Sequence, residues 1–154
     1  MRMDAHIVER LCHAHVWVAG DPMVDRYTHG VCDRVSPEAP VPVVRMGKEE
    51  VRLGGAANVA NNLRALGVEV SLCGGVGCDP SAQTLQELLQ QQGIHSFLQS
   101  SAQTQTIVKW RIVSRNQQVL RLDQENRLLP QCLPQHINSD SQNNSLQALI
   151  VLTI

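Results

Sequence analysis

Apolar positions recur along the chain with two different periods, and these periods predict its regular elements. Short runs of β-branched and other apolar residues predict strands over residues 15–19, 68–73 and 94–98. Apolar spacings of three and four predict helices over residues 56–66 and 81–92, and a glycine follows each of them. Strand and helix therefore alternate, which is typical of a parallel sheet with helices on its faces.

Each predicted helix has an apolar face, and a glycine-rich turn separates two of the elements. The first helix is expected to bury Ala56, Val59, Ala60, Leu63 and Leu66. The second is expected to bury Leu85, Leu88 and Leu89. Residues 74–79 contain three glycines and predict a turn after the strand over 68–73. Gly75 and Gly77 lack the remaining glycine of a dinucleotide-binding fingerprint, so we expect no dinucleotide there.

Two extended segments, residues 27–35 and 41–51, interrupt the alternation of strand and helix. Prolines at positions 37 and 40 lie between them and exclude a helix. We expect these segments to lie outside the main sheet, as a flap. A hairpin is expected further along the chain, with strands over 106–113 and 119–123.

The last thirty residues or so differ in composition from the rest of the chain. Residues 124–147 are rich in Gln, Asn and Ser, and are compatible with either a poor helix around Leu133 and Ile137 or a loop. Residues 148–154 predict a buried strand. A parallel strand with no helix after it is typical of an interrupted domain. We therefore expect an extension over 1–14 and an incomplete domain over 15–154.

Composition places the chain among reduced globular proteins. Apolar residues make up 43% of its 154 residues and charged residues 18%, which suits a single domain with a substantial core. A net charge of −1 gives no electrostatic reason to expect nucleic acid or an anionic membrane surface as partner. The five cysteines are odd in number, contain no Cys-x-x-Cys pair, and predict a cytoplasmic location. No export signal, membrane-spanning segment or zinc-type ligand spacing is expected.

The pair Gly54–Gly55 and the nearby Asn58 form the first candidate binding motif. Glycines at the start of a helix allow close approach to bare backbone, and the first helical turn offers free N–H groups. Together with the Asn58 amide, they would suit a hydroxyl-rich ligand such as a sugar. The alternative is a simple turn before an alanine-rich core helix.

Asp25 is the second candidate. It follows the first predicted strand, on a loop at the edge where open α/β sheets bind ligands. A carboxylate there can accept hydrogen bonds from two neighbouring hydroxyl groups of a sugar. The alternative is a turn aspartate that accepts bonds from backbone N–H groups.

A group of cationic side chains is the third candidate. Lys109 and Arg111 alternate on one predicted strand, Arg121 lies on its hairpin partner, and Arg34 lies in the flap. Arginines clustered in this way can bind a phosphate group in bidentate fashion. The alternative is a solvated hairpin face with no ligand.

Four stretches of sequence carry a family resemblance, in this order: residues 20–27, 34–44, 54–60 and 114–123. Arg-Val-Ser-Pro-Glu-Ala-Pro-Val-Pro-Val and Ser-Arg-Asn-Gln-Gln are the most specific runs. Together they resemble the kinase domain of the bifunctional heptose-7-phosphate kinases and heptose-1-phosphate adenylyltransferases, a branch of the ribokinase (PfkB) family. The resemblance is strong over residues 15–125 and weak over 126–154.

The resemblance implies an α/β fold, a partial ribokinase-like doubly wound sheet with a small β lid over about residues 27–51. It implies transfer of phosphate from ATP, with Mg²⁺, to the anomeric hydroxyl of D-glycero-β-D-manno-heptose 7-phosphate, a step toward ADP-heptose and lipopolysaccharide. The lid would also pair two copies as a homodimer. The residues implied to bind substrate are Asp25, Gly54, Gly55 and Asn58 for the sugar, and Arg34, Lys109, Arg111 and Arg121 for its phosphate.

Length is the main departure from the family pattern. The family's catalytic base and its ATP site follow later in the sequence than residue 154, so we expect the acceptor side of the kinase here, without activity in this chain alone. Two alternatives remain open. One is a non-enzymatic remnant or a dimerisation module built on the lid, and the other is a fragment of a different ribokinase-like sugar kinase.

Overall fold

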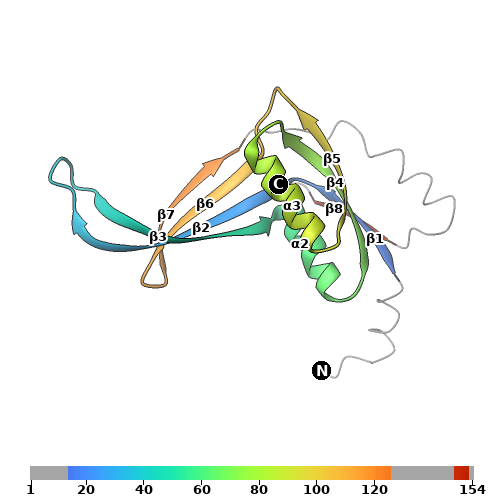
Figure 1. Cartoon of the computed structure of the whole chain (residues 1–154), viewed down its shortest axis with the longest axis horizontal. Coiled ribbons are helices and arrows are strands. Elements are labelled where there is room, and N and C mark those ends of the chain that lie inside the picture. Colours follow the sequence, from blue (N-terminus) through green and yellow to red (C-terminus); the bar gives the residue numbers. More distant parts are fainter. Residues whose placement is uncertain (1–13, 126–147, 153–154) are drawn as a thin grey trace, which may run out of the picture.

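The computed structural model describes residues 14–125 and 148–152, which form two four-stranded sheets and two helices (Figure 1). The expected extension over 1–14 and the segment over 124–147 fall almost entirely outside the described residues. None of the described helices is long and apolar enough to cross a membrane.

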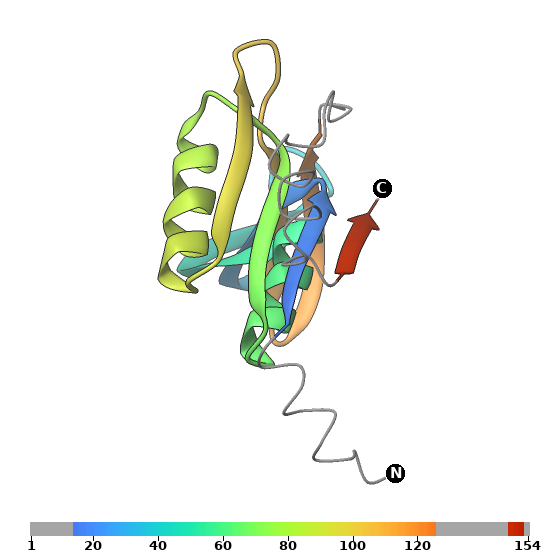
Figure 2. The same cartoon turned by 90° about the vertical axis from the view of Figure 1, so that its right-hand side faces the viewer.

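Sheet A is the parallel sheet that the alternating pattern predicts. Its strands are adjacent in the order β5-β4-β1-β8, and every pairing is parallel. Figure 2 shows this order, from the yellow β5 to the red β8. The bounds are β1 (His15–Gly20), β4 (Glu69–Gly77), β5 (His95–Ser101) and β8 (Ala148–Leu152).

Helices α2 (Gly55–Ala65) and α3 (Pro80–Gln91) confirm both helix predictions. Glycines close them as expected, because Gly67 and Gly93 adopt φ values of 88° and 66°, which glycine tolerates best. Both helices join the core formed by one face of sheet A. One predicted core position, Leu66, is wrong: it is the residue after α2 and its side chain is 53% exposed.

The expected turn over residues 74–79 is also wrong, because β4 continues to Gly77. Gly74 lies inside the strand, against the junction where β1 gives way to β2. A Cβ at Gly74 would meet the carbonyl oxygen of Gly20 and lie 2.5 Å from Cδ of Pro22. The glycine thus permits close packing within the sheet and does not reverse the chain.

Sheet B holds the flap segments, together with the predicted hairpin, in the order β3-β2-β6-β7. Only Asp21 separates β1 from β2, and β2 and β3 extend from sheet A as a long two-stranded arm (Figure 1). The hairpin turns at Arg115 and Asn116, both with positive φ. The bounds are β2 (Pro22–Val35), β3 (Pro42–Gly54), β6 (Ile107–Ser114) and β7 (Gln117–Gln124).

Strand β8 is paired as expected but is not buried. Leu149 and Val151 are 40% and 62% exposed, so the prediction of a buried strand is wrong for the residues described there. Within the described part of the chain, β8 lies at the edge of sheet A and pairs with β1 alone. An apolar sequence therefore does not show that this strand is buried, because only β1 lies beside it in the sheet.

Candidate functional site

Asp25 lies on strand β2, where this strand leaves sheet A. The expectation of a loop at this point is wrong, because β2 begins at Pro22. Arg111 donates a hydrogen bond from Nη1 to Oδ1 of Asp25 at 2.5 Å, and these side chains are only 20% and 18% exposed. A charge-assisted bond of this kind fixes the carboxylate in place.

The glycine pair lies directly beside this carboxylate. A Cβ on Gly54 would stand 2.9 Å from Oδ2 of Asp25, so the absence of a side chain lets the carboxylate rest on the backbone. Gly55 has a φ of 54°, and its missing side chain makes room for the Asp21 carbonyl group and for Met23. The glycines therefore shape the start of α2. Atoms of Asp21, Met23 and Asp25 lie in the space beside them, where the sequence analysis expected a ligand.

Asn58 lies one helical turn after Gly54 and is exposed to solvent. Its side chain makes no hydrogen bond with the part of the chain that the structure describes. Since Gly54 contacts Asp25, the amide of Asn58 belongs to the same end of α2 as the carboxylate. The four sugar candidates, Asp25, Gly54, Gly55 and Asn58, thus lie at the start of α2, near the junction between the two sheets.

Three of the four candidate cations lie on the same face of sheet B as Asp25. Asp25 pairs in register with Lys109, and Arg111 pairs with Arg121 one step farther out. Directly paired residues, and residues two apart on a strand, present their side chains to one face. The predicted clustering of Lys109, Arg111 and Arg121 is therefore present in the sheet.

Arg34 is the candidate that the fold separates from the others. It lies nine residues after Asp25 on β2, which corresponds to about 30 Å along an extended strand. Its register partner is Val43, near the far end of the arm. Within one copy of the chain, Arg34 does not join the site around Asp25.

Sequence reasoning missed two further residues of this face, Arg52 and Tyr27. Arg52 pairs in register with Asp25 across β3, and Tyr27 follows Asp25 by two residues on β2. The guanidinium carbons of Arg52 and Arg111 lie 5.0 and 5.2 Å from the centre of the Tyr27 ring. The alternation of Glu50 and Arg52 in the sequence places both on one face of a strand. It does not show which residues of β2 lie beside them, so it could not place Arg52 next to Asp25.

The cations of this face are paired with carboxylates in the described residues. Besides the bond between Arg111 and Asp25, these pairs are Lys109 with Glu125 at 3.5 Å, Arg121 with Asp123 at 2.8 Å, and Arg52 with Glu50 at 2.8 Å. Hydrogen bonds from Lys48 and Arg52 lower the pKa of Glu50 to about 2. The face is thus strongly charged and locally balanced.

At the junction the pKa values of Arg111 and Asp21 are both raised, for different reasons. The hydrogen bond to Asp25 raises the pKa of Arg111, and this effect together with nearby negative charge outweighs the opposing effect of burial. Burial raises the pKa of Asp21, whose backbone carbonyl accepts a hydrogen bond from Ala56 at 3.0 Å. Arg111 is therefore positively charged at neutral pH.

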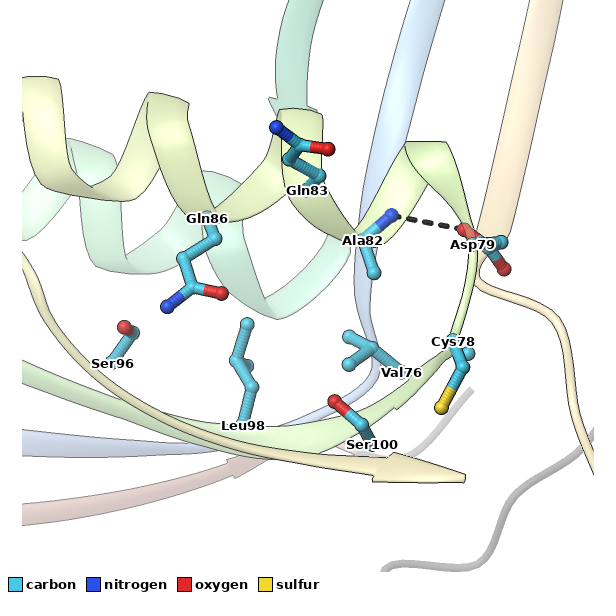
Figure 3. Close-up of a pocket in the computed structure, with 10 residues that line it drawn as sticks. Val76, Cys78, Asp79, Ala82, Gln83, Gln86, Ser96, Leu98 and Ser100 are labelled. Carbon is cyan, nitrogen blue, oxygen red and sulfur yellow. Dashed lines mark hydrogen bonds between the residues drawn. The ribbon is translucent and has the colours of Figure 1, made fainter. Parts of the chain in front are cut away.

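A separate pocket of about 280 Å³ lies between α3 and β5 (Figure 3). Ser96 and Ser100 face it from the strand and Gln86 from the helix, and Asp79 lies at its edge, so its lining is largely polar. None of the predicted site residues lines it. Over residues 14–125 and 148–152, no three His, Cys, Asp or Glu side chains gather closely enough to hold a metal ion.

Curated relatives share sequence with most of this chain. A D-beta-D-heptose 7-phosphate kinase from Bordetella bronchiseptica is 46% identical over 131 residues, covering 85% of this chain and 42% of that protein. A bifunctional protein HldE from Pseudomonas entomophila is 53% identical over 116 residues, covering 75% and 24%. The chain thus spans less than half the length of these relatives.

Solved structures show the same fold at low sequence identity. A putative ribokinase from Agrobacterium tumefaciens has a TM-score of 0.65 and 19% identity, covering 90% of this chain and 44% of that one. A fructokinase from Xylella fastidiosa, solved with bound ATP, has a TM-score of 0.53 and 16% identity, covering 72% and 33%. These likenesses confirm the expected ribokinase-like α/β fold. The family model for pfkB carbohydrate kinases matches residues 20–152, and the chain therefore belongs to this family.

Proposed function

We propose that this chain binds the sugar acceptor of a heptose 7-phosphate kinase. The names of the curated relatives support the substrate class. The observation that carries the proposal is the position of the Asp25 carboxylate, which rests on Gly54 at the start of α2 and is held by Arg111. Asp25 and Asn58 would bind hydroxyl groups of the sugar, while Gly54 and Gly55 shape the backbone between them.

The charges on sheet B would bind the phosphate of the substrate. Lys109, Arg111 and Arg121 share the face of Asp25, so one ligand can contact hydroxyl-binding and phosphate-binding groups together. Sheet B, including the arm over residues 27–51, would act as a lid. Closing it over the sugar excludes water and directs phosphoryl transfer to the sugar hydroxyl.

The complete reaction would use ATP and Mg²⁺, as pfkB kinases generally do. The phosphate would be transferred to the anomeric hydroxyl of D-glycero-β-D-manno-heptose 7-phosphate, in a cytoplasmic step toward ADP-heptose and lipopolysaccharide. Transfer also requires metal and nucleotide binding and a base for the attacking hydroxyl. We assign those tasks to the part of the relatives that this chain does not match, and propose that these 154 residues bind the acceptor without turnover.

A second role, pairing of two copies through sheet B, is favoured by one observation. The face of sheet B opposite to Asp25 carries apolar side chains that extend beyond the core. Leu120 and Leu122 on β7 are 50% and 52% exposed, and Met46 on the arm is 64% exposed. Apolar side chains gathered on a sheet face in this way are typical of a protein interface.

Calorimetry with heptose 7-phosphate tests the binding proposal. The 154-residue chain should bind this sugar phosphate, and Asp25→Asn should weaken binding about tenfold or more, because a neutral amide replaces a charged acceptor and the bond from Arg111 loses its ionic component. Asp33→Asn is the matched control, since Asp33 pairs with Arg45 on the exposed arm. Absence of binding by the unmodified chain, or equal affinity in all three proteins, would contradict the proposal.

A further inference from the structure

Tyr27 brings two arginines from different strands to one place on sheet B. Arg52 reaches it from β3 and Arg111 from β6, and each guanidinium carbon lies within about 5 Å of the ring centre. A guanidinium group is attracted to an aromatic ring at this distance. The ring therefore offsets part of the repulsion between the two cations and keeps both on the face that carries Asp25.

The two arginines retain donors for a ligand. A guanidinium group has five N–H donors, and Arg111 uses Nη1 for Asp25 while Arg52 uses Nη2 for Glu50. Arg52 is 62% exposed, so solvent and ligands reach it. If an anion displaced Glu50 from Arg52, Glu50 would keep its bond to Lys48 at 2.9 Å. The exchange would leave no carboxylate without a cation.

The position of the pair along the strand suits one end of a phosphorylated sugar. Tyr27 lies two residues beyond Asp25, a step of about 7 Å along an extended strand. A ligand whose hydroxyl groups contact Asp25 would therefore place a group one sugar-ring length away beside Tyr27. Lys109 instead lies in register with Asp25 itself. Its side chain is only 18% exposed and forms an ion pair with Glu125.

We propose that Arg52 joins Arg111 in binding the phosphate group of the sugar, and that the Tyr27 ring, which holds these two arginines together, makes them the centre of the phosphate subsite within the cationic face. Arg52 is then a substrate-binding residue, and Tyr27 is a positioning residue that acts through both arginines. The subsite distinguishes phosphorylated from unphosphorylated sugar. It rests on the proposed function, because the sugar must first be bound at Asp25.

The test compares heptose 7-phosphate with heptose by calorimetry on the 154-residue chain. Arg52→Gln should weaken binding of the phosphorylated sugar about tenfold to a hundredfold, the effect of losing hydrogen bonds to a charged group, and should leave heptose affinity unchanged. Lys48→Gln is the matched control. It removes another cation that pairs with Glu50, but among the described interactions Lys48 makes no contact with the Tyr27 ring. The Lys48→Gln variant should therefore keep the full preference for phosphorylated over unphosphorylated heptose.

Two substitutions at Tyr27 separate positioning from folding. Tyr27→Phe keeps the aromatic face and should keep the preference for phosphorylated sugar, whereas Tyr27→Leu removes the face and should reduce that preference about tenfold or less. Thermal melts confirm that each variant is folded. Equal losses for both sugars, no loss in Arg52→Gln, or equal preferences in both Tyr27 variants would overturn the subsite, while the unmodified chain still binds. Failure of the unmodified chain to bind either sugar would overturn the proposed function and the subsite with it.

Discussion

Sheet A and sheet B differ in how much of their side-chain surface is buried and in how their strands are held together. In sheet A, Val18 and Leu72 are fully buried between neighbouring strands and the two helices, so apolar burial holds this sheet together. In sheet B, the outer strand β7 is exposed along its whole length, and the ion pair between Arg111 and Asp25 joins β6 to β2 on one face. The first arrangement gives a rigid base. The second leaves ion-paired and apolar side chains exposed on the outer strands.

The comparison predicts a large effect from a cavity in sheet A. Leu72→Ala on β4 should lower the free energy of unfolding by about 2–5 kcal/mol, because it removes a fully buried side chain between β1 and β5 and leaves a void. Leu122→Ala on β7 is the matched control and should lower it by less than about 1 kcal/mol, since that side chain is half exposed. Denaturant unfolding measures both. Equal losses would contradict the distinction between the sheets.

Sequence periodicity predicted sheet A well because its residues act through local patterns. Leu85 and Leu89 recur at helical spacing and are fully buried as expected. The prediction of a turn at Gly74 is wrong, because a side chain there would collide with Gly20 and Pro22, which are distant in the sequence. Local sequence carries no information about such a contact.

The site on sheet B was predicted only in part, for a related reason. The spacing of Lys109 and Arg111 placed both on one face, which the register confirms. The partnership of Arg52, Tyr27 and Arg111 depends instead on which residues of three strands lie side by side. Register across β2 and β3 is fixed by pairing over the whole arm, so no single segment of sequence reveals it.

Asp79 joins the two regions and predicts a smaller, pH-dependent effect. Its carboxylate accepts hydrogen bonds from the N–H groups of Ala82 at the start of α3, at 2.9 Å, and of Thr106 just before β6, at 2.7 Å. Asp79→Asn places an amide donor against one of these donors and should lower the free energy of unfolding by about 1–2 kcal/mol. Asp33→Asn on the exposed arm should change it by less than about 0.5 kcal/mol.

The pH dependence of that effect follows from the pKa of Asp79. Burial raises this pKa, but the hydrogen bonds from Thr106, Ala82 and Ser81 outweigh burial and hold it below its usual value of 3.8. The stabilisation is therefore complete above pH 3.8 and is lost as the pH falls through the lower pKa of the folded state. Unfolding curves between pH 2 and pH 6 should converge for Asp79→Asn and the unmodified chain at the acid end. A constant difference across this range would show that the charge of Asp79 is not responsible.

The smallest effect on stability is expected from the exposed apolar face of sheet B. Leu122→Ser should change the free energy of unfolding by less than about 0.5 kcal/mol, because its side chain is 52% exposed, yet it should weaken self-association about tenfold if sheet B pairs two copies. Val151→Ser removes an equally apolar side chain, 62% exposed on β8 of sheet A, and should leave self-association unchanged. Sedimentation equilibrium of the three proteins measures the difference. A stronger effect of Val151→Ser than of Leu122→Ser would move the interface to the edge of sheet A, and sheet B would then serve the ligand alone.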